Sequence, residues 1–310
     1  MTGFGPGTKG IDMENRFFTA LVLAPLLIAL LAAPVTASAA DSIPIFQEFD
    51  VTQGIVGRST TLRDNLHVGP LSELNSNVKY VVSPQISKDF LLRVGAEWQG
   101  FFFPAQRHAA APDTLQQVNA ILGFDYQLGE QWLMRAELQP GLYGDLIRPD
   151  WRTFDAPIKL GAAYLVDADL QWFFGLRVDA RSQYPVFPAL GLRWKFTDVW
   201  TLDLEFPDTR LQYDVTDKFQ AYLGVGILAG TYVVSDHYGT DRGLPQLNHA
   251  TLDYTEVRLG PGFSWKARPN VTLEAEAGYQ LYQTWDFFDQ HLSPSSHPLP
   301  YLQLAVHARF

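Results

Sequence analysis

The stretch Phe90–Phe102, FLLRVGAEWQGFF, alternates between apolar and polar side chains along most of its length. Its apolar even positions are Phe90, Leu92, Val94, Ala96, Trp98 and Phe102, and its polar odd positions include Arg93, Glu97 and Gln99. Successive side chains of an extended chain point to opposite faces, whereas a helix would not keep this phase. The segment therefore predicts a β-strand with one apolar and one polar face.

The same period of two continues through the chain in segments of about ten residues, the length that a tilted strand needs to cross a bilayer. The expected strands are Phe49–Gly57, Val78–Ile86, Phe90–Phe102, Val118–Leu128, Trp132–Leu138, Ile158–Val166, Leu170–Ala180, Val186–Phe196, Trp200–Phe206, Thr209–Val215, Phe219–Ala229, Val257–Trp265, Val271–Leu281 and Leu302–Phe310. Their number is about fourteen, with twelve possible, and bacterial barrels have even numbers of strands. The sequence thus predicts an all-β fold, a transmembrane antiparallel β-barrel.

A soluble β-sandwich also alternates, and the lengths of the connections separate the two folds. Tight connections are expected at Ser87–Asp89, Gly129–Gln131, Asp167–Asp169, Thr197–Asp198, Thr216–Lys218 and Lys266–Asn270. Long connections are expected at Phe103–Thr114, Gly144–Asp155, Gly230–Ala250 and Tyr282–Pro300. Short turns at one rim and long loops at the other are typical of outer-membrane barrels. The brief hairpin Phe206–Thr209 interrupts the long-loop side and predicts a notch in that rim.

Aromatic residues gather beside the short turns, at positions of outward parity. They are Phe90, Trp132, Trp194, Phe196, Trp200, Phe219, Trp265 and Phe310. A soluble core would place aromatic side chains in mid-strand as often as at one end. The pattern favours an aromatic girdle at one membrane interface.

The N-terminal segment is typical of an export signal. An apolar run, Phe17–Ala33, precedes Ala37-Ser38-Ala39, the small-x-small pattern of a secretory cleavage site. Pro25 interrupts the run, which argues against an uncleaved membrane helix. We expect a signal peptide at residues 1–39, cleavage near Ala39 or Ala40, and a barrel at residues 40–310.

Composition restricts the partners of the exported chain. Cysteine is absent, which excludes disulfides and thiolate metal sites. The net charge of −10 repels phosphate backbones, so we expect no nucleic-acid partner. Translation can start at Met1 or at Met13, and the sequence does not decide between them.

Several phrases of the sequence resemble a bacterial outer-membrane β-barrel family of unknown function. They are Phe187–Trp194 (FPALGLRW), Thr197–Pro207 (TDVWTLDLEFP), Tyr213–Ala229, and Glu256–Asp289, which ends in WDFFD. The resemblance covers most of the mature chain and implies a barrel located in the bacterial outer membrane. These turn-and-strand phrases carry no active site that could be transferred.

The last strand resembles the C-terminal signal that barrel-assembly machinery recognises. Its alternating apolar residues end on an aromatic side chain and are Leu302, Leu304, Val306, Ala308 and Phe310. The expected partners are therefore this machinery, during biogenesis, and outer-membrane lipid.

Inward positions carry charges of both signs. Counting from the tight turns pairs Asp125 with Arg135, Arg193 with Asp203, and Glu205 with Arg210. The same counting sets Glu274 opposite Gly262 and Glu276 opposite Gly260. The pore-lining candidates are Glu274, Glu276, Arg258, Glu205, Arg210, Arg193, Asp203, Asp125 and Arg135. These charges either sort solutes in a pore or satisfy one another in a filled barrel, and both interpretations stay open.

The sequence predicts a passive, porin-like channel for small solutes or ions. The alternative is a non-conducting structural or adhesive barrel, and a more remote alternative is an outer-membrane hydrolase. Asp236-His237 with Asp241 resembles the acid and base of a hydrolase, but the pair is as expected of a polar loop. His291 and His297 match no familiar metal-ligand spacing. We expect no enzyme activity, no cofactor and no metal.

Overall fold

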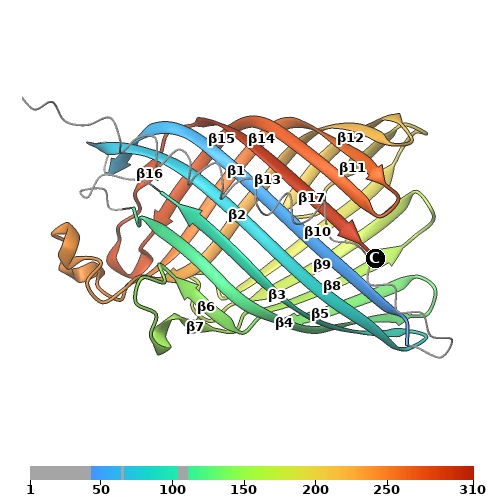
Figure 1. Cartoon of the computed structure of the whole chain (residues 1–310), viewed down its shortest axis with the longest axis horizontal. Helices are drawn as coiled ribbons and strands as arrows, with labels where there is room; N and C mark the ends of the chain where they lie inside the picture. Colours follow the sequence, from blue (N-terminus) through green and yellow to red (C-terminus); the bar gives the residue numbers. More distant parts are fainter. Residues whose placement is uncertain (1–42, 64–65, 104–110) are drawn as a thin grey trace, which may run out of the picture. The chain divides into compact units, whose positions relative to one another are not determined.

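The computed structural model describes residues 43–63, 66–103 and 111–310. Within these residues seventeen strand segments form one sheet. Three of them are short pieces at the ends of longer strands or in loops, namely β6 (Gly141–Gly144), β7 (Phe154–Asp155) and β16 (Ser295–Ser296). The other fourteen form a wall that closes where the first strand pairs with the last (Figure 1). The expected signal peptide and its cleavage at Ala39 or Ala40 lie outside the described residues.

Each wall strand pairs antiparallel with the next along the chain. The strands are β1 (Ile45–Arg63), β2 (Leu66–Ser87), β3 (Phe90–Phe102), β4 (Thr114–Leu128), β5 (Trp132–Leu138), β8 (Ile158–Leu165), β9 (Leu170–Val178), β10 (Val186–Lys195), β11 (Trp200–Asp203), β12 (Asp208–Thr216), β13 (Phe219–Val233), β14 (Thr251–Arg268), β15 (Val271–Asp286) and β17 (Leu299–Arg309). All fourteen strands expected from the alternation are confirmed.

Four short 3-10 helices interrupt the loops. They are η1 (Trp151–Thr153), η2 (Thr240–Arg242), η3 (Pro245–Leu247) and η4 (Phe288–Gln290). In the described part of the chain, no helix combines the length and the apolar content needed to cross a membrane.

Several strands extend beyond the range that alternation indicated. β14 begins at Thr251 instead of Val257, and β1 continues to Arg63 instead of ending at Gly57. Lipid imposes the alternation only within the hydrocarbon, while the backbone ladder continues wherever two strands remain side by side. The alternation therefore located the membrane-spanning part of each strand and missed its extension.

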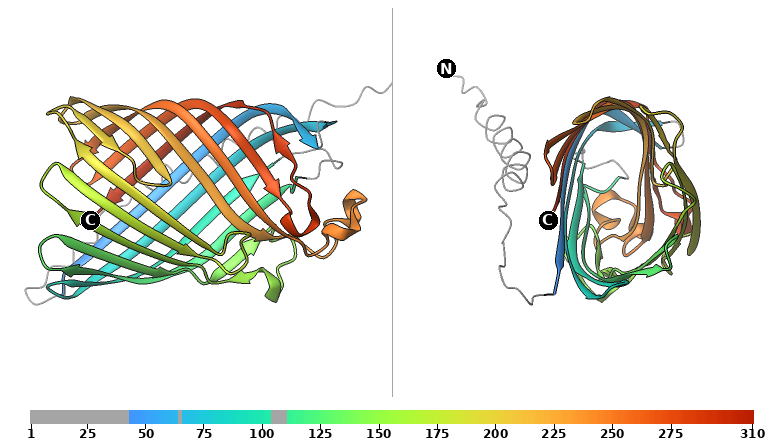
Figure 2. Two further views of the ribbon diagram at one scale, coloured as in Figure 1. Left: turned by 180° about the vertical axis from the view of Figure 1, so that it is seen from behind. Right: turned by 90° about the vertical axis from the view of Figure 1, so that its right-hand side faces the viewer.

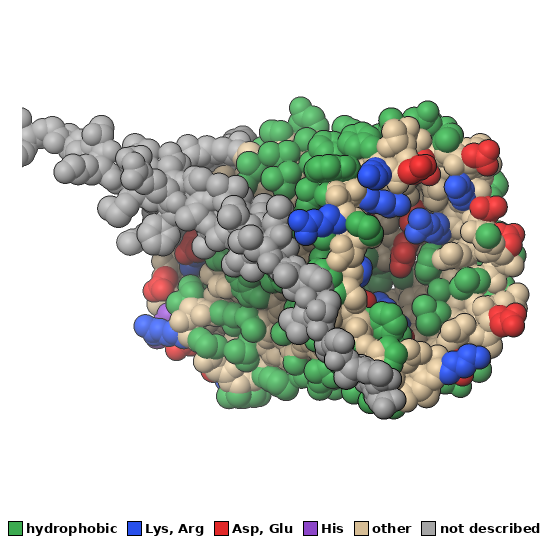
Figure 3. Space-filling model, turned by 45° about the vertical axis from the view of Figure 1, so that its right-hand side comes forward, with side chains coloured by type: hydrophobic (Ala, Val, Ile, Leu, Met, Phe, Trp, Pro, Cys, Tyr) green, Lys and Arg blue, Asp and Glu red, His purple; other side chains and the backbone are tan. Residues whose placement is uncertain are grey.

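The wall is apolar outside and polar inside. Outward side chains such as Leu122, Leu190 and Leu223 are 45%, 65% and 52% exposed, whereas the inward Arg93 and Asn119 are buried. Figure 3 presents apolar side chains over much of the outer surface and charged side chains around a hollow at one end. A surface of this kind is stable in lipid and unfavourable in water.

The aromatic side chains beside the short turns contact aromatic partners on neighbouring strands. The ring centroids of Trp132 and Tyr164 lie 4.8 Å apart, and those of Trp200 and Tyr213 lie 4.9 Å apart. The chain ends at the same rim, which Figure 1 marks with the C-terminus. The long connections lie at the opposite rim (Figure 2).

The expected notch in the long-loop rim is confirmed. β11 ends at Asp203 and β12 starts at Asp208, and between them the peptide bond from Phe206 to Pro207 is cis. The flanking strands β10 and β13 continue beyond this hairpin, which stops partway up the wall (Figure 2).

Two adjacent alanines of β8 test the facing of the wall. Ala162 has the outward parity of Leu160 and Tyr164, and Ala163 has the inward parity of Lys159. Replacing Ala162 by Arg places a charge against lipid and should lower the free energy of unfolding by roughly 2–4 kcal/mol. Ala163→Arg should lower the free energy of unfolding by less than half of that amount. Urea unfolding in lipid vesicles measures both, and an equal loss in the two variants would contradict the assigned facing.

Candidate functional site

The lumen holds two clusters of buried charges. In the first, the Arg93 guanidinium lies 3.0 Å from Glu48 and 2.9 Å from Glu137. Arg135 donates two hydrogen bonds to Asp125, at 2.7 and 2.8 Å, which confirms the pairing expected from the turns. Such bidentate pairs fix geometry as well as charge, so this cluster holds β1, β3, β4 and β5 together from the inside.

In the second cluster, Arg258 lies between two carboxylates. Its guanidinium is 3.2 Å from Glu73 and 2.5 Å from Glu256, and all three side chains are buried. The Tyr254 hydroxyl donates to Glu256, and the Gln283 amide donates to Glu73. Arg258 was an expected lumenal residue, whereas Glu73 was missed because the strand expected in this region started only at Val78.

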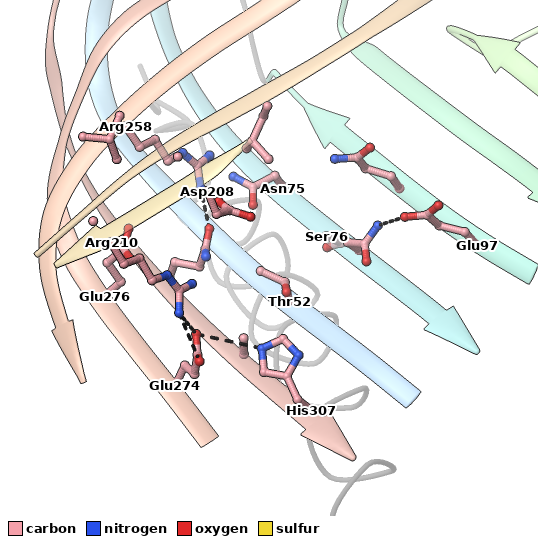
Figure 4. A pocket seen from close by; sticks show the side chains of 18 residues that line it. Thr52, Asn75, Ser76, Glu97, Asp208, Arg210, Arg258, Glu274, Glu276 and His307 are labelled. Atoms are coloured by element: carbon pink, nitrogen blue, oxygen red, sulfur yellow. Dashed lines mark hydrogen bonds and ion pairs between the residues drawn. The ribbon is translucent and has the colours of Figure 1, made fainter. Parts of the chain in front are cut away.

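A cavity of about 280 Å³ opens between β1–β3, β12–β15 and β17, and Figure 4 presents its lining. We call it the acidic cavity. Four carboxylates and two guanidinium groups line it, from Glu97, Asp208, Glu274, Glu276, Arg210 and Arg258. Arg210 binds Glu274 at 3.0 Å, and the Tyr301 hydroxyl donates to Glu276. The lining therefore has a net negative charge.

Three of the expected cross-strand pairings needed correction. Glu276 faces Gly262 and Glu274 faces Ser264, two residues from the expected partners, because the β14–β15 ladder extends into the turn as far as Arg268. Arg210 is opposite Asp203, and not Glu205, because β11 ends at Asp203. The expected register of Arg193 with Asp203 is confirmed.

Two further cavities lie along the lumen beyond the acidic cavity. One of about 270 Å³, the middle cavity, is lined by Lys79, Glu97, Arg135, Glu137 and Lys159 and shares Glu97 with the acidic cavity. The other, of about 600 Å³, lies between β8–β10 and β13–β14 at the notch and shares Lys159 with the middle cavity. The charged lumenal side chains Glu97 and Lys159 thus lie between neighbouring cavities.

A cluster of buried apolar side chains fills part of the barrel at the long-loop rim. We call this cluster the apolar plug, which consists of Phe101, Phe103, Ala111, Leu115, Tyr143, Tyr232, Val234, Tyr238, Leu247, Leu252, Tyr254, Trp285 and Phe287. Tyr238 and Leu247 belong to the loop between β13 and β14, which overlaps the lumen in the view along the barrel (Figure 2). Sequence periodicity gave no sign of the plug, because most of its residues lie either in loops, as Tyr238 does, or in strand extensions beyond the expected ranges, as Tyr232 and Tyr254 do.

Residues 87–307 match a protein-family model described as Domain of unknown function (DUF6268). The chain belongs to this family. The match spans β3 to β17, so the DUF6268 domain includes nearly the whole wall. No protein among the curated ones matches this DUF6268 chain.

Solved structures with a similar fold are remote from the DUF6268 chain. The COG4313 outer membrane channel from Pseudomonas putida F1 is 9% identical, with a TM-score of 0.47, over 90% of this chain and 100% of that one. A deletion mutant of the monoaromatic hydrocarbon channel TodX is 11% identical, with a TM-score of 0.43, over 91% and 93%. The NanC porin is 11% identical, with a TM-score of 0.39, over 84% and 98%. Likeness at this level carries no information about the solute.

His237 and Asp236, the candidate base and acid, lie in the loop between β13 and β14. His237 lies 3.6 Å from Asp236, and both side chains are largely exposed. Across residues 43–63, 66–103 and 111–310, no three His, Asp or Glu side chains come together as a metal site would require. The lumen is therefore the candidate functional site of this DUF6268 protein.

Arg258 tests whether the second cluster stabilises the barrel. Arg258→Met leaves Glu73 and Glu256 buried and unpaired, which should lower the free energy of unfolding in lipid vesicles by about 3–5 kcal/mol. Adding Glu73→Gln and Glu256→Gln to this variant should restore most of the loss, because no buried charge then remains. A loss below about 1 kcal/mol for Arg258→Met would mean that water reaches the cluster freely.

Proposed function

We propose that this protein is a passive channel for small solutes or ions in the bacterial outer membrane. One observation supports the proposal above the others, namely that neighbouring lumenal cavities lined by charged side chains lie inside the barrel. A structural barrel has no need of such spaces, and buried voids cost stability. Rings of charged side chains around a water-filled path are how pores select ions.

The proposed path starts at the rim with the short turns and passes through the acidic cavity. Glu97 borders both the acidic and the middle cavity, so solutes moving between them pass its carboxylate. Lys159 has the same position between the middle cavity and the space at the notch. The path therefore alternates between negative and positive side chains.

The proposal includes export of the chain, insertion by the assembly machinery and contact with outer-membrane lipid. The signal peptide exports the chain, and the terminal strand with Phe310 and Leu302 is recognised by the assembly machinery. The apolar outer wall then contacts outer-membrane lipid, for which Leu190 and Leu223 are well exposed. We assign no catalytic step and no cofactor to the lumen.

The apolar plug is the one observation that favours the alternative, a non-conducting structural or adhesive barrel. Its side chains are packed against one another at the long-loop rim, as in a protein core. Conduction in a bilayer decides between the two functions.

Planar-bilayer recording of the refolded mature protein should yield discrete conductance steps in potassium chloride. Glu97→Trp should reduce the step size at least twofold, because a large side chain then occupies the border of two cavities. Val94→Trp, an outward position of the same strand, is the matched control and should conduct as the unaltered protein does. Absence of any conductance step would contradict the channel and support the structural barrel.

The acidic cavity should make the channel prefer cations. Glu274→Gln combined with Glu276→Gln leaves two carboxylates against two guanidinium groups, which removes the net negative charge of the lining. The reversal potential in a salt gradient should therefore move toward zero. Glu130→Gln with Asp167→Asn removes two charges from short turns and is the control. An unchanged reversal potential in the lumenal variant would exclude these carboxylates from the path.

A further inference from the structure

The cavity of about 600 Å³ at the notch is the largest of the three cavities, and its lining is mostly apolar. We call it the notch cavity. Its volume is that of a site for a small molecule. Apolar side chains of β8–β10, the β11–β12 hairpin and β13 line it, namely Leu160, Leu176, Phe187, Phe206, Pro207 and Ile227. Such walls offer water few hydrogen bonds, so an apolar molecule displaces that water at little cost.

Aromatic side chains give the notch cavity flat surfaces. The ring centroids of Phe187 and Phe206 lie 5.2 Å apart, and Tyr184 of the loop between β9 and β10 also lines the cavity. The three side chains are 43%, 40% and 68% exposed, so their rings are accessible to a ligand. Aromatic rings pack favourably against other aromatic rings in stacked or edge-on arrangements. The lining therefore suits a ligand that contains a ring.

The charges around the notch cavity balance. Lys159 and Arg177 are the two cations of its lining, and Asp179 and Asp253 are the two carboxylates. The Arg177 guanidinium lies 2.6 Å from Asp179. Lys159 is opposite Glu137 in the β5–β8 ladder, and this carboxylate lines the middle cavity together with Lys159. The cations are therefore matched by carboxylates of the wall and do not select an anion.

The Asp253 carboxylate is occupied by hydrogen bonds. The Ser182 hydroxyl and the Gln183 backbone N–H donate to one of its oxygens, at 3.0 and 2.9 Å, and the Thr231 hydroxyl donates to the other at 2.7 Å. These three donors leave it little capacity to bind a cation. A charged ligand would lose its hydration here without gaining a free counter-ion, which is unfavourable. The lining therefore favours uncharged molecules.

Two uncharged polar side chains are available to such a ligand. Tyr184 and Thr255 line the notch cavity, and within the described residues their hydroxyl groups make no hydrogen bond. A hydroxyl group both donates and accepts hydrogen bonds, so either one can pair with a hydroxyl group of the ligand. An apolar lining with a few polar groups that orient the ligand is the usual form of a small-molecule site.

We propose that the notch cavity binds small uncharged aromatic alcohols. The aromatic ring packs against Phe187 and Phe206, and the hydroxyl group bonds with Tyr184 or Thr255. This inference names a solute class for the channel and in that respect rests on the proposed function, whereas binding in the cavity does not itself require conduction.

A photoreactive aromatic alcohol tests the site. The mature protein in lipid nanodiscs is irradiated with a benzyl alcohol that carries a trifluoromethyl diazirine in the para position, and the adducts are mapped by mass spectrometry. Saturable adducts should concentrate on residues 184–189, 206–207 and 227–229. Excess para-tert-butylbenzyl alcohol should suppress them at least fivefold. The para-tert-butyl benzoate and benzylammonium ions should suppress them less than twofold, because neither charge finds a free partner in the cavity.

Matched variants separate binding in the cavity from general contact with lipid. Ala229→Trp fills the cavity from β13 and should reduce the saturable labelling at least fivefold. Ala221→Trp lies on the same face of β13, about 27 Å away along the strand, and should leave labelling unchanged. Phe187→Leu removes one ring contact and should weaken saturable labelling at least threefold. Gel mobility before and after heating checks that each variant is folded.

Labelling that is spread evenly over the outward positions of all strands, or that Ala229→Trp leaves unchanged, would overturn the site. Suppression by either ion equal to that by the alcohol would overturn the uncharged class. Conductance in potassium chloride is recorded from the same preparation. Conductance without saturable labelling defeats the site alone, whereas saturable labelling without conductance defeats the aqueous channel and supports the site.

Discussion

Backbone N–H and C=O groups find no water in the hydrocarbon core of a bilayer, so a sheet placed there must close on itself. β1 and β17 meet this requirement by pairing from Glu48 opposite Arg309 to Val56 opposite Tyr301. Closure gives each strand one face toward lipid and one toward the lumen, which directs charged side chains of the membrane-spanning wall, such as Arg93 and Glu137, inward. The polar interior and its ion pairs follow from that restriction.

The interior is neither an empty tube nor a filled core. The Arg93 and Arg258 clusters occupy two parts of it with ion pairs between guanidinium groups and carboxylates, and the apolar plug occupies a third. Between them lie neighbouring cavities that are lined by charged side chains of both signs. Where the hairpin before Asp208 stops partway up the wall, a further cavity lies between β8–β10 and β13–β14. These spaces are where the proposed function resides.

Alternation along the sequence was sufficient to predict the fourteen strands and their facing, because contact with lipid imposes that pattern on each of them. It could not predict Glu73, which lies in an extension of β2 where lipid imposes nothing, nor the exact partners of Glu274 and Glu276, because a turn two residues tighter shifts the whole register. The plug depends on loop side chains such as Tyr238, which meet only in the folded barrel. The notch was predictable, since it needs only one brief hairpin.

Because the sequence contains no cysteine, the reaction rate of a single introduced cysteine reports whether its position contacts water or lipid. Glu97 and Trp98 are adjacent in β3, and Glu97 borders two lumenal cavities while Trp98 has outward parity. In vesicle-embedded protein, Glu97→Cys should react with a charged, membrane-impermeant thiosulfonate at least tenfold faster than Trp98→Cys. A bilayer-dissolved pyrene maleimide should show the opposite preference. Equal rates with both reagents, or faster reaction of Trp98→Cys with the charged one, would contradict a barrel with a water-filled lumen.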